Sequence, residues 1–170
     1  VSQPLTLALA ADSDPVWAPD GRRIAFRSLQ TGRPALFTKQ AHDQDAEDET
    51  LIEAEATPTD WRGSEVIVQM ADGASGYDVV SIDERGSRTT IARSGFNDTD
   101  GRWSPDGAWL AYVSDESGRP DIYANRRSGN RTRVSFGGGS RPRWSRDGRS
   151  LFFLRGSTIM RAAPAGGASA

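Results

Sequence analysis

Short apolar or alternating segments of four to seven residues, each bounded by a turn signal, recur along the whole chain. No segment keeps apolar residues at the i, i+3, i+4, i+7 spacing of an amphipathic helix over three turns. The one helix-like stretch, Asp43–Ala56, is acidic and short, and we interpret it as a loop followed by a strand. We therefore expect an all-β protein. The predicted strands are Arg23–Ser28, Pro34–Lys39, Thr50–Glu53, Glu65–Met70, Tyr77–Ile82, Thr89–Arg93, Ala108–Ser114, Asp121–Asn125, Arg131–Val134, Ser150–Arg155 and Thr158–Arg161.

The pattern repeats four times. Trp17, Trp61, Trp103 and Trp144 follow one another at intervals of 44, 42 and 41 residues. Three of the tryptophans precede an Asp-Gly pair, a tight-turn signal because Gly accepts the left-handed position of the turn. A repeat of roughly 40–45 residues with four short strands is typical of a β-propeller blade. We predict four-stranded blades at about 13–56, 57–98, 99–139 and 140–161, a flexible tail at 162–170, and tryptophans packed between neighbouring blades.

The fourth repeat ends before its outer strand. Leu5–Leu9 precedes the first repeat, and we predict that it forms this strand, so that the propeller domain covers residues 1–161. Two arrangements stay open: a four-bladed ring closed within one chain, or an arc completed by a second copy, for which a dimer is favoured. Residues 1–85 carry 16 acidic and 7 basic side chains, whereas residues 86–170 carry 7 and 14. This opposite charge favours head-to-tail docking of two copies.

Composition excludes several classes of protein. With no Cys, the chain has no disulfides and no cysteine-based zinc site, and one His cannot build a multi-histidine metal site. No apolar run approaches the roughly 18 residues of a membrane helix. The start of the chain has no basic leader, so we do not interpret it as a signal peptide. The net charge of −2 argues against a nucleic-acid partner.

Candidate binding residues lie just before the repeated tryptophans, where the first strand of each blade begins at the channel mouth of a propeller. These residues are Asp14, Asp60, Asp100, Arg102, Arg141 and Arg143. Together they would hold a small polar ligand, or a divalent cation such as calcium or zinc with Asp14, Asp60, Asp100 and His42 as metal candidates. The alternative is that the carboxylates and guanidinium groups neutralise one another. The acidic segment after His42 lacks the spacing of an EF-hand and is predicted to be a solvated loop.

The repeat carries a family resemblance. The run Trp103-Ser-Pro-Asp-Gly-Ala-Trp-Leu-Ala-Tyr-Val-Ser, followed by Gly118-Arg-Pro-Asp-Ile-Tyr, resembles the TolB-type propeller repeat. The stretch from Phe96 to about residue 154 is also similar to the C-terminal propeller of certain bacterial serine/threonine kinases. Complete members have six or more blades, so four would be a fragment. The resemblance implies a bacterial protein and, for a TolB-like one, a periplasmic or other extracytoplasmic location.

Two functions follow from the resemblance. The first is a non-catalytic module that presents a propeller face or channel mouth to a protein or a small polar ligand. The second is a metal-dependent hydrolase of the lactonase or phosphotriesterase kind, with its site at the axis or at an oligomer interface. The chain has no Gly-x-Ser-x-Gly nucleophile motif and a single Lys, which argues against serine-hydrolase and kinase activity. We expect the binding module.

Overall fold

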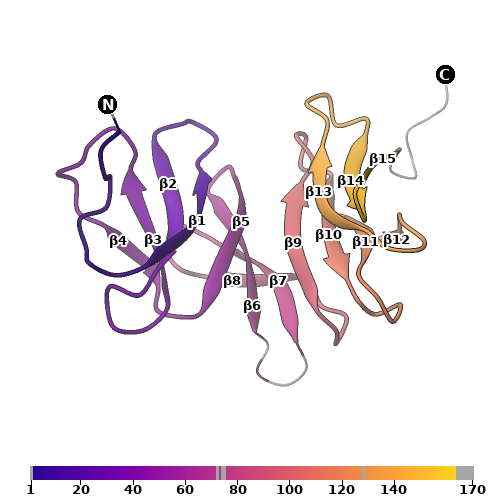
Figure 1. The fold of residues 1–170 in the computed structure, drawn as a ribbon, viewed down its shortest axis with the longest axis horizontal. Coiled ribbons are helices and arrows are strands. Elements are labelled where there is room, and N and C mark those ends of the chain that lie inside the picture. The colour runs from indigo at the N-terminus through magenta and orange to yellow at the C-terminus, as the bar shows by residue number, and fades with distance from the viewer. Residues whose placement is uncertain (1, 72, 74–75, 128, 164–170) are drawn as a thin grey trace. The chain divides into compact units, whose positions relative to one another are not determined.

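The computed structural model describes residues 2–71, 73, 76–127 and 129–163, and within these ranges the chain forms fifteen strands (Figure 1). In this part of the chain there is no helix, and so none that is long and apolar enough to cross a membrane. The chain divides into two compact units, one of Val1–Ala71 with Val80–Thr89 and one of Asp72–Val79 with Thr90–Ala170.

The strands form four antiparallel sheets in which neighbours in the chain are neighbours in the sheet. The first sheet contains β1 (Asp12–Trp17), β2 (Arg23–Ser28), β3 (Ala35–Gln40) and β4 (Glu49–Ile52). The second contains β5 (Ala56–Arg62), β6 (Glu65–Ala71), β7 (Tyr77–Ile82) and β8 (Arg88–Ala92). The third contains β9 (Asp98–Trp103), β10 (Trp109–Ser114), β11 (Asp121–Arg126) and β12 (Arg131–Arg133). The last contains β13 (Ser140–Trp144), β14 (Leu151–Arg155) and β15 (Thr158–Ala162). The predicted all-β fold of propeller blades is confirmed, and each predicted strand between Arg23 and Arg161 lies within one residue of an observed one.

The Asp-Gly pairs form the turns that the sequence predicts. Gly21 has φ 68° and donates its N–H to the carbonyl of Ala18 at 2.9 Å. The carboxylate of Asp20 accepts the N–H of Arg22 at 2.9 Å, which satisfies a donor that the turn leaves open. The same pattern recurs at Gly107 and Gly148. These turns join the first and second strands of three sheets and fix the register there.

Each unit has a core made from alternating positions of adjacent strands. In the first unit, side chains of the first sheet such as Ala25 and Leu36 pack with Trp61, Val66 and Val68 of the second sheet. In the second unit, Ala111, Val113 and Ile122 pack with Leu151 and Phe153. One face of each sheet is thus buried against a neighbouring sheet of the same unit. Sheets that bury a face on the next repeat are typical of propeller architecture.

The repeated tryptophans differ in burial. Trp61 and Trp103 are 6% and 8% exposed, and Trp144 donates its indole N–H to the carbonyl of Arg102 in the preceding repeat at 3.0 Å. Trp17 is 58% exposed, so the prediction of packing between blades is wrong for this residue. It belongs to the first repeat, and none of the described residues covers its ring as the first sheet covers Trp61.

Leu5–Leu9 is not a strand, which corrects the prediction for this segment. Leu7 is 63% exposed and Leu9 fully so. The described part of the last sheet has three strands, with β15 at its edge. Without a neighbouring strand, Leu5–Leu9 has no hydrogen-bond ladder to hold it extended. The predicted tail begins one residue too early, because Ala162 ends β15, and residues 164–170 lie outside the described ranges.

Candidate functional site

The candidate residues lie at a β-bulge that recurs in the first strand of every sheet. The register shifts between Ser13 and Val16 in β1, and equivalent shifts occur in β5, β9 and β13. Asp14, Asp100 and Arg141, each three residues before a repeated tryptophan, have left-handed φ values of 55°, 49° and 54°. Non-glycine residues adopt this conformation at a cost of about 1–3 kcal/mol. The second sheet has Pro58 at this position, and proline cannot take a positive φ.

Asp100 lies between two guanidinium groups. Its Oδ1 accepts the Nη2 and Nε hydrogens of Arg102 at 3.0 and 3.2 Å, and the Nη1 of Arg143 lies 3.6 Å away. Arg143 also donates to the carbonyl of Pro142 at 2.7 Å. We call Asp100, Arg102 and Arg143 the first-strand cluster. The structure thus brings together three of the six predicted binding residues, from β9 and β13.

The other predicted residues have separate places. Arg141 is exposed, two residues before Arg143 on β13, and Asp14 is exposed on β1 in the other unit. Asp60 accepts the N–H of Trp61 at 3.0 Å. His42 is exposed, and its Nε2 lies 3.2 Å from the carbonyl of Gly21.

The predicted metal ligands Asp14, Asp60, Asp100 and His42 come from both units. Among the described residues, no group of three or more His, Asp or Glu side chains is arranged to hold a metal ion. Asp100 is instead bound to arginines, whose positive charge opposes that of a cation. The acidic segment after His42 is a loop, as predicted. There Asp43 accepts the N–H groups of Asp45 and Ala46, and Asp48 pairs with the buried Lys39 at 3.0 Å.

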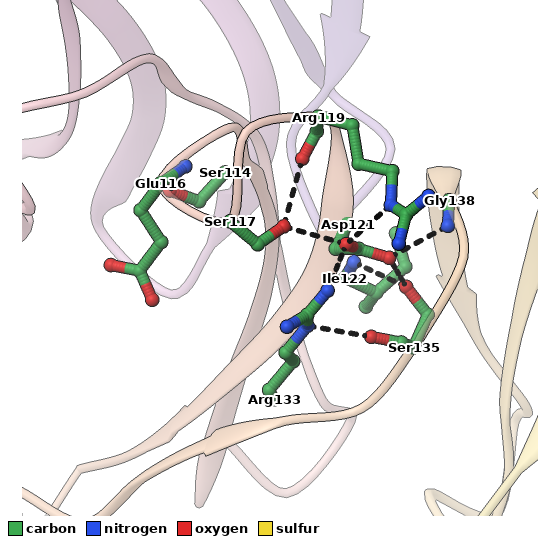
Figure 2. Close-up of polar contacts among 9 residues, drawn as sticks. All are labelled: Ser114, Glu116, Ser117, Arg119, Asp121, Ile122, Arg133, Ser135 and Gly138. Atoms are coloured by element: carbon green, nitrogen blue, oxygen red, sulfur yellow. Dashed lines mark hydrogen bonds and ion pairs between the residues drawn. The ribbon is translucent and has the colours of Figure 1, made fainter.

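A second polar cluster, which the sequence analysis missed, surrounds Asp121 at the start of β11 (Figure 2). This carboxylate is fully buried. It accepts hydrogen bonds from Ser117 at 2.7 Å, Ser135 at 2.8 Å, the N–H of Gly138 at 2.8 Å and Nη2 of Arg133 at 2.5 Å. Burial alone would raise the pKa of Asp121, but these donors lower it to about 2. The group is therefore a fixed negative charge that orients Arg133.

Arg131, which lies on β12 together with Arg133, is also held by side-chain contacts. Its Nε donates to the Tyr112 hydroxyl at 2.6 Å, and its Nη1 pairs with Glu116 at 2.6 Å. The guanidinium carbon lies 4.5 Å from the ring centroid of Tyr123 and 5.7 Å from that of Tyr112. Burial raises the pKa of Tyr112 to about 12, so this hydroxyl stays protonated at neutral pH. Arg131 and Arg133 thus have defined positions on the edge strand β12.

Comparison with known proteins identifies the repeat. The family model described as the TolB beta propeller domain matches residues 62–165. The Tol-Pal system protein TolB of Bordetella pertussis is 31% identical over 122 residues, which cover 64% of this chain and 26% of that protein. The chain therefore spans about a quarter of the length of this curated relative.

Solved structures show the same fold. The crystal structure of TolB from Acinetobacter baumannii superposes with a TM-score of 0.75 and 22% identity, and the match covers 92% of this chain and 41% of that one. The structure of a putative TolB from Agrobacterium tumefaciens gives a TM-score of 0.73 and 20% identity, over 85% and 54% of the two chains. The resemblance to TolB-type propellers is confirmed.

Proposed function

The chain belongs to the TolB beta-propeller domain family, and from this premise we propose that it is a non-catalytic propeller module that binds a protein partner. The curated relative is named as a protein of the Tol-Pal system. We expect this module to work in the same kind of assembly, in an extracytoplasmic compartment. Within the described residues, no metal-binding cluster supports the hydrolase alternative.

The observation that carries the proposal is the repeated strain at one position. Three of the four first strands hold a charged side chain in left-handed backbone conformation. Such strain persists only where the surrounding structure enforces it, and it is concentrated at functional sites. At three of the four bulges a charged side chain occupies the same place of the repeat. In the second unit the two bulges contribute Asp100, Arg102, Arg141 and Arg143, and several charges spread over two strands suit a protein partner better than a small substrate.

The charge of this surface in the second unit indicates the kind of partner. The first-strand cluster carries one carboxylate and two guanidinium groups, and Arg141 adds a third guanidinium group. The net charge at these four residues is therefore +2. The side chain of Arg143 is 55% exposed, so it can pair with a carboxylate of a partner while Asp100 keeps it in place. We expect the bound surface of the partner to be acidic.

Replacing Arg141 and Arg143 together with glutamate tests this proposal. We expect the wild-type chain to bind a purified Tol or Pal component in surface plasmon resonance. The double variant should bind at least about tenfold more weakly. Reversing two charges at an interface should make the free energy of binding less favourable by more than about 1.4 kcal/mol. Arg155→Glu, an exposed position on β14, is the matched control and should bind like the wild type. Absence of binding to every component, or an equal loss in the control, would contradict the proposal.

We also propose that a second copy completes the arc of blades. Trp17 and Ile159 are 58% and 73% exposed in the first and last sheets, and the two halves of the chain carry opposite net charge. Light scattering after size exclusion should give twice the chain mass of 18.4 kDa at low salt, and a lower value at high salt. A mass of 18.4 kDa at both salt concentrations and at high protein concentration would refute the dimer.

A further inference from the structure

An open groove of about 500 Å³ lies beside the third sheet. It is lined by Phe96, Glu116, Ser117, Tyr123, Arg131 and Arg133. All six residues belong to the second unit, and two of them come from β12, the outermost strand of the sheet. The groove includes none of the residues of the first-strand cluster, so it is a separate site.

Two guanidinium groups give the groove its chemistry. Arg131 and Arg133 are two residues apart on β12, so their side chains leave the same face of the strand. The contacts to Tyr112 and Glu116 use Nε and Nη1 of Arg131. Those of Arg133 use Nε and Nη2, as Figure 2 shows. Among the described residues, Nη2 of Arg131 and Nη1 of Arg133 have no hydrogen-bond partner. Each can therefore donate to an anionic group in the groove.

These donors are held in place before any ligand arrives. Asp121, buried and ionised, fixes Arg133, and the stacked rings of Tyr112 and Tyr123 support Arg131. The guanidinium carbon of Arg133 also lies 4.9 Å from the ring centroid of Phe136. Little conformational entropy is lost when such groups bind an anion, so preorganisation favours affinity.

The groove is also lined by an exposed aromatic ring. Phe96 is 48% exposed, although the loop that carries it is firmly held. Asn97 donates its backbone and side-chain N–H groups to Asp115 at 2.9 and 2.7 Å, and Ser94 donates to the buried Asp98 at 2.8 Å. An exposed ring on an ordered loop next to paired cations fits a ligand that has an apolar side chain beside a carboxylate.

We propose that this groove binds an acidic segment of a protein partner, in extended conformation along the edge strand β12. The carboxylates of the segment pair with Arg131 and Arg133, and an apolar side chain packs on Phe96. An open sheet edge offers backbone hydrogen bonds to an added strand. Glu116 also lines the groove, and its charge disfavours the continuous phosphate backbone of a nucleic acid.

Fluorescence anisotropy with a labelled heptapeptide tests the groove. The probe has three acidic residues separated by phenylalanines, and its neutral twin has glutamine and asparagine instead of the acids. We expect the acidic peptide to bind at least about tenfold more tightly than the twin, and less tightly as salt rises. Arg131→Gln and Phe96→Ala should each weaken binding by about tenfold, whereas Arg155→Gln, outside the groove, should leave it unchanged.

Three results would overturn the proposal: equal affinity for both peptides, equal loss in the Arg155→Gln control, or tighter binding of single-stranded oligothymidine with the same dependence on Arg131. The last result would assign the groove to nucleic acid. If circular dichroism shows that Arg131→Gln does not fold, the affinity of Phe96→Ala for the acidic peptide tests the proposal instead. The Phe96 side chain is half exposed and carries no charge, so its removal should leave the fold intact. The Arg141 and Arg143 double variant should still bind the peptide, so failure of the first-strand proposal is distinguishable from failure of this one.

Discussion

Replacing Asp121 with alanine is expected to lower the free energy of unfolding by about 3 kcal/mol, measured by urea denaturation. The carboxylate accepts hydrogen bonds from Ser117, Ser135, Gly138 and Arg133, and is itself fully buried. Without it, these donors lose their partner inside the protein, which costs far more than the loss of an exposed ion pair. The variant should also lose the fixed position of Arg133.

Asp20→Ala is the matched control, because Asp20 is an exposed turn carboxylate that accepts the N–H of Arg22. We expect this change to cost about 1 kcal/mol or less. Equal losses in the two variants would contradict the role of the buried cluster. The pH dependence gives a second check. The pKa of Asp121 is lowered to about 2 in the folded protein, so its contribution to stability is complete above about pH 5 and is lost as the pH falls from about 5 through 2.

Trp61→Ala is expected to destabilise the first unit by about 3–5 kcal/mol, whereas Trp17→Ala should cost about 1 kcal/mol or less at protein concentrations at which the chain is monomeric. The two residues occupy the same position of the repeat. Trp61 is 6% exposed and packs in a core with Val66 and Leu36, whereas Trp17 is 58% exposed. Burial, and not repeat position, therefore decides the size of the loss. The shift in the urea midpoint of each variant measures it.

A large loss on Trp17→Ala would show that its ring is covered in solution. Dilution then separates two explanations. If the loss disappears when the protein is diluted below its dimer dissociation constant, a second copy covers Trp17. If the loss is the same at every concentration, a segment of the same chain covers it.

Strand positions were predictable because the chain repeats a local code. The turn signals and the alternating strands of a repeat lie within that repeat, and they need no contact distant in sequence to be recognised. Four copies of the motif therefore predict four sheets. Leu5–Leu9 shows the limit of that reasoning. Its sequence is apolar enough for a strand, but a strand needs a neighbour, and the neighbour is decided by contacts distant in sequence. Trp17 fails for the same reason, because none of the described residues covers its ring as the first sheet covers Trp61.

The candidate site was only partly predictable. Counting back from the tryptophans found the bulge positions, since a repeat places equivalent residues alike. The alternative that carboxylates and guanidinium groups neutralise one another describes Asp100, which pairs with Arg102 and Arg143. Spacing alone could not select these partners, because ion pairing depends on side-chain geometry across two strands. The Asp121 cluster had a signal that went unused. A carboxylate at the start of a buried strand must find donors, and the serines and arginines around it are the residues that supply them.

Hydrogen–deuterium exchange of the chain, with and without a purified Tol or Pal component, tests the central claim most directly. The claim is that a non-catalytic propeller module binds its partner through charged residues at the first-strand bulges. We predict slower exchange on binding at residues 98–103 and 140–144, and no change at 150–155, which holds the control position Arg155. Protection confined to other segments, or none at a concentration that saturates binding, would contradict it.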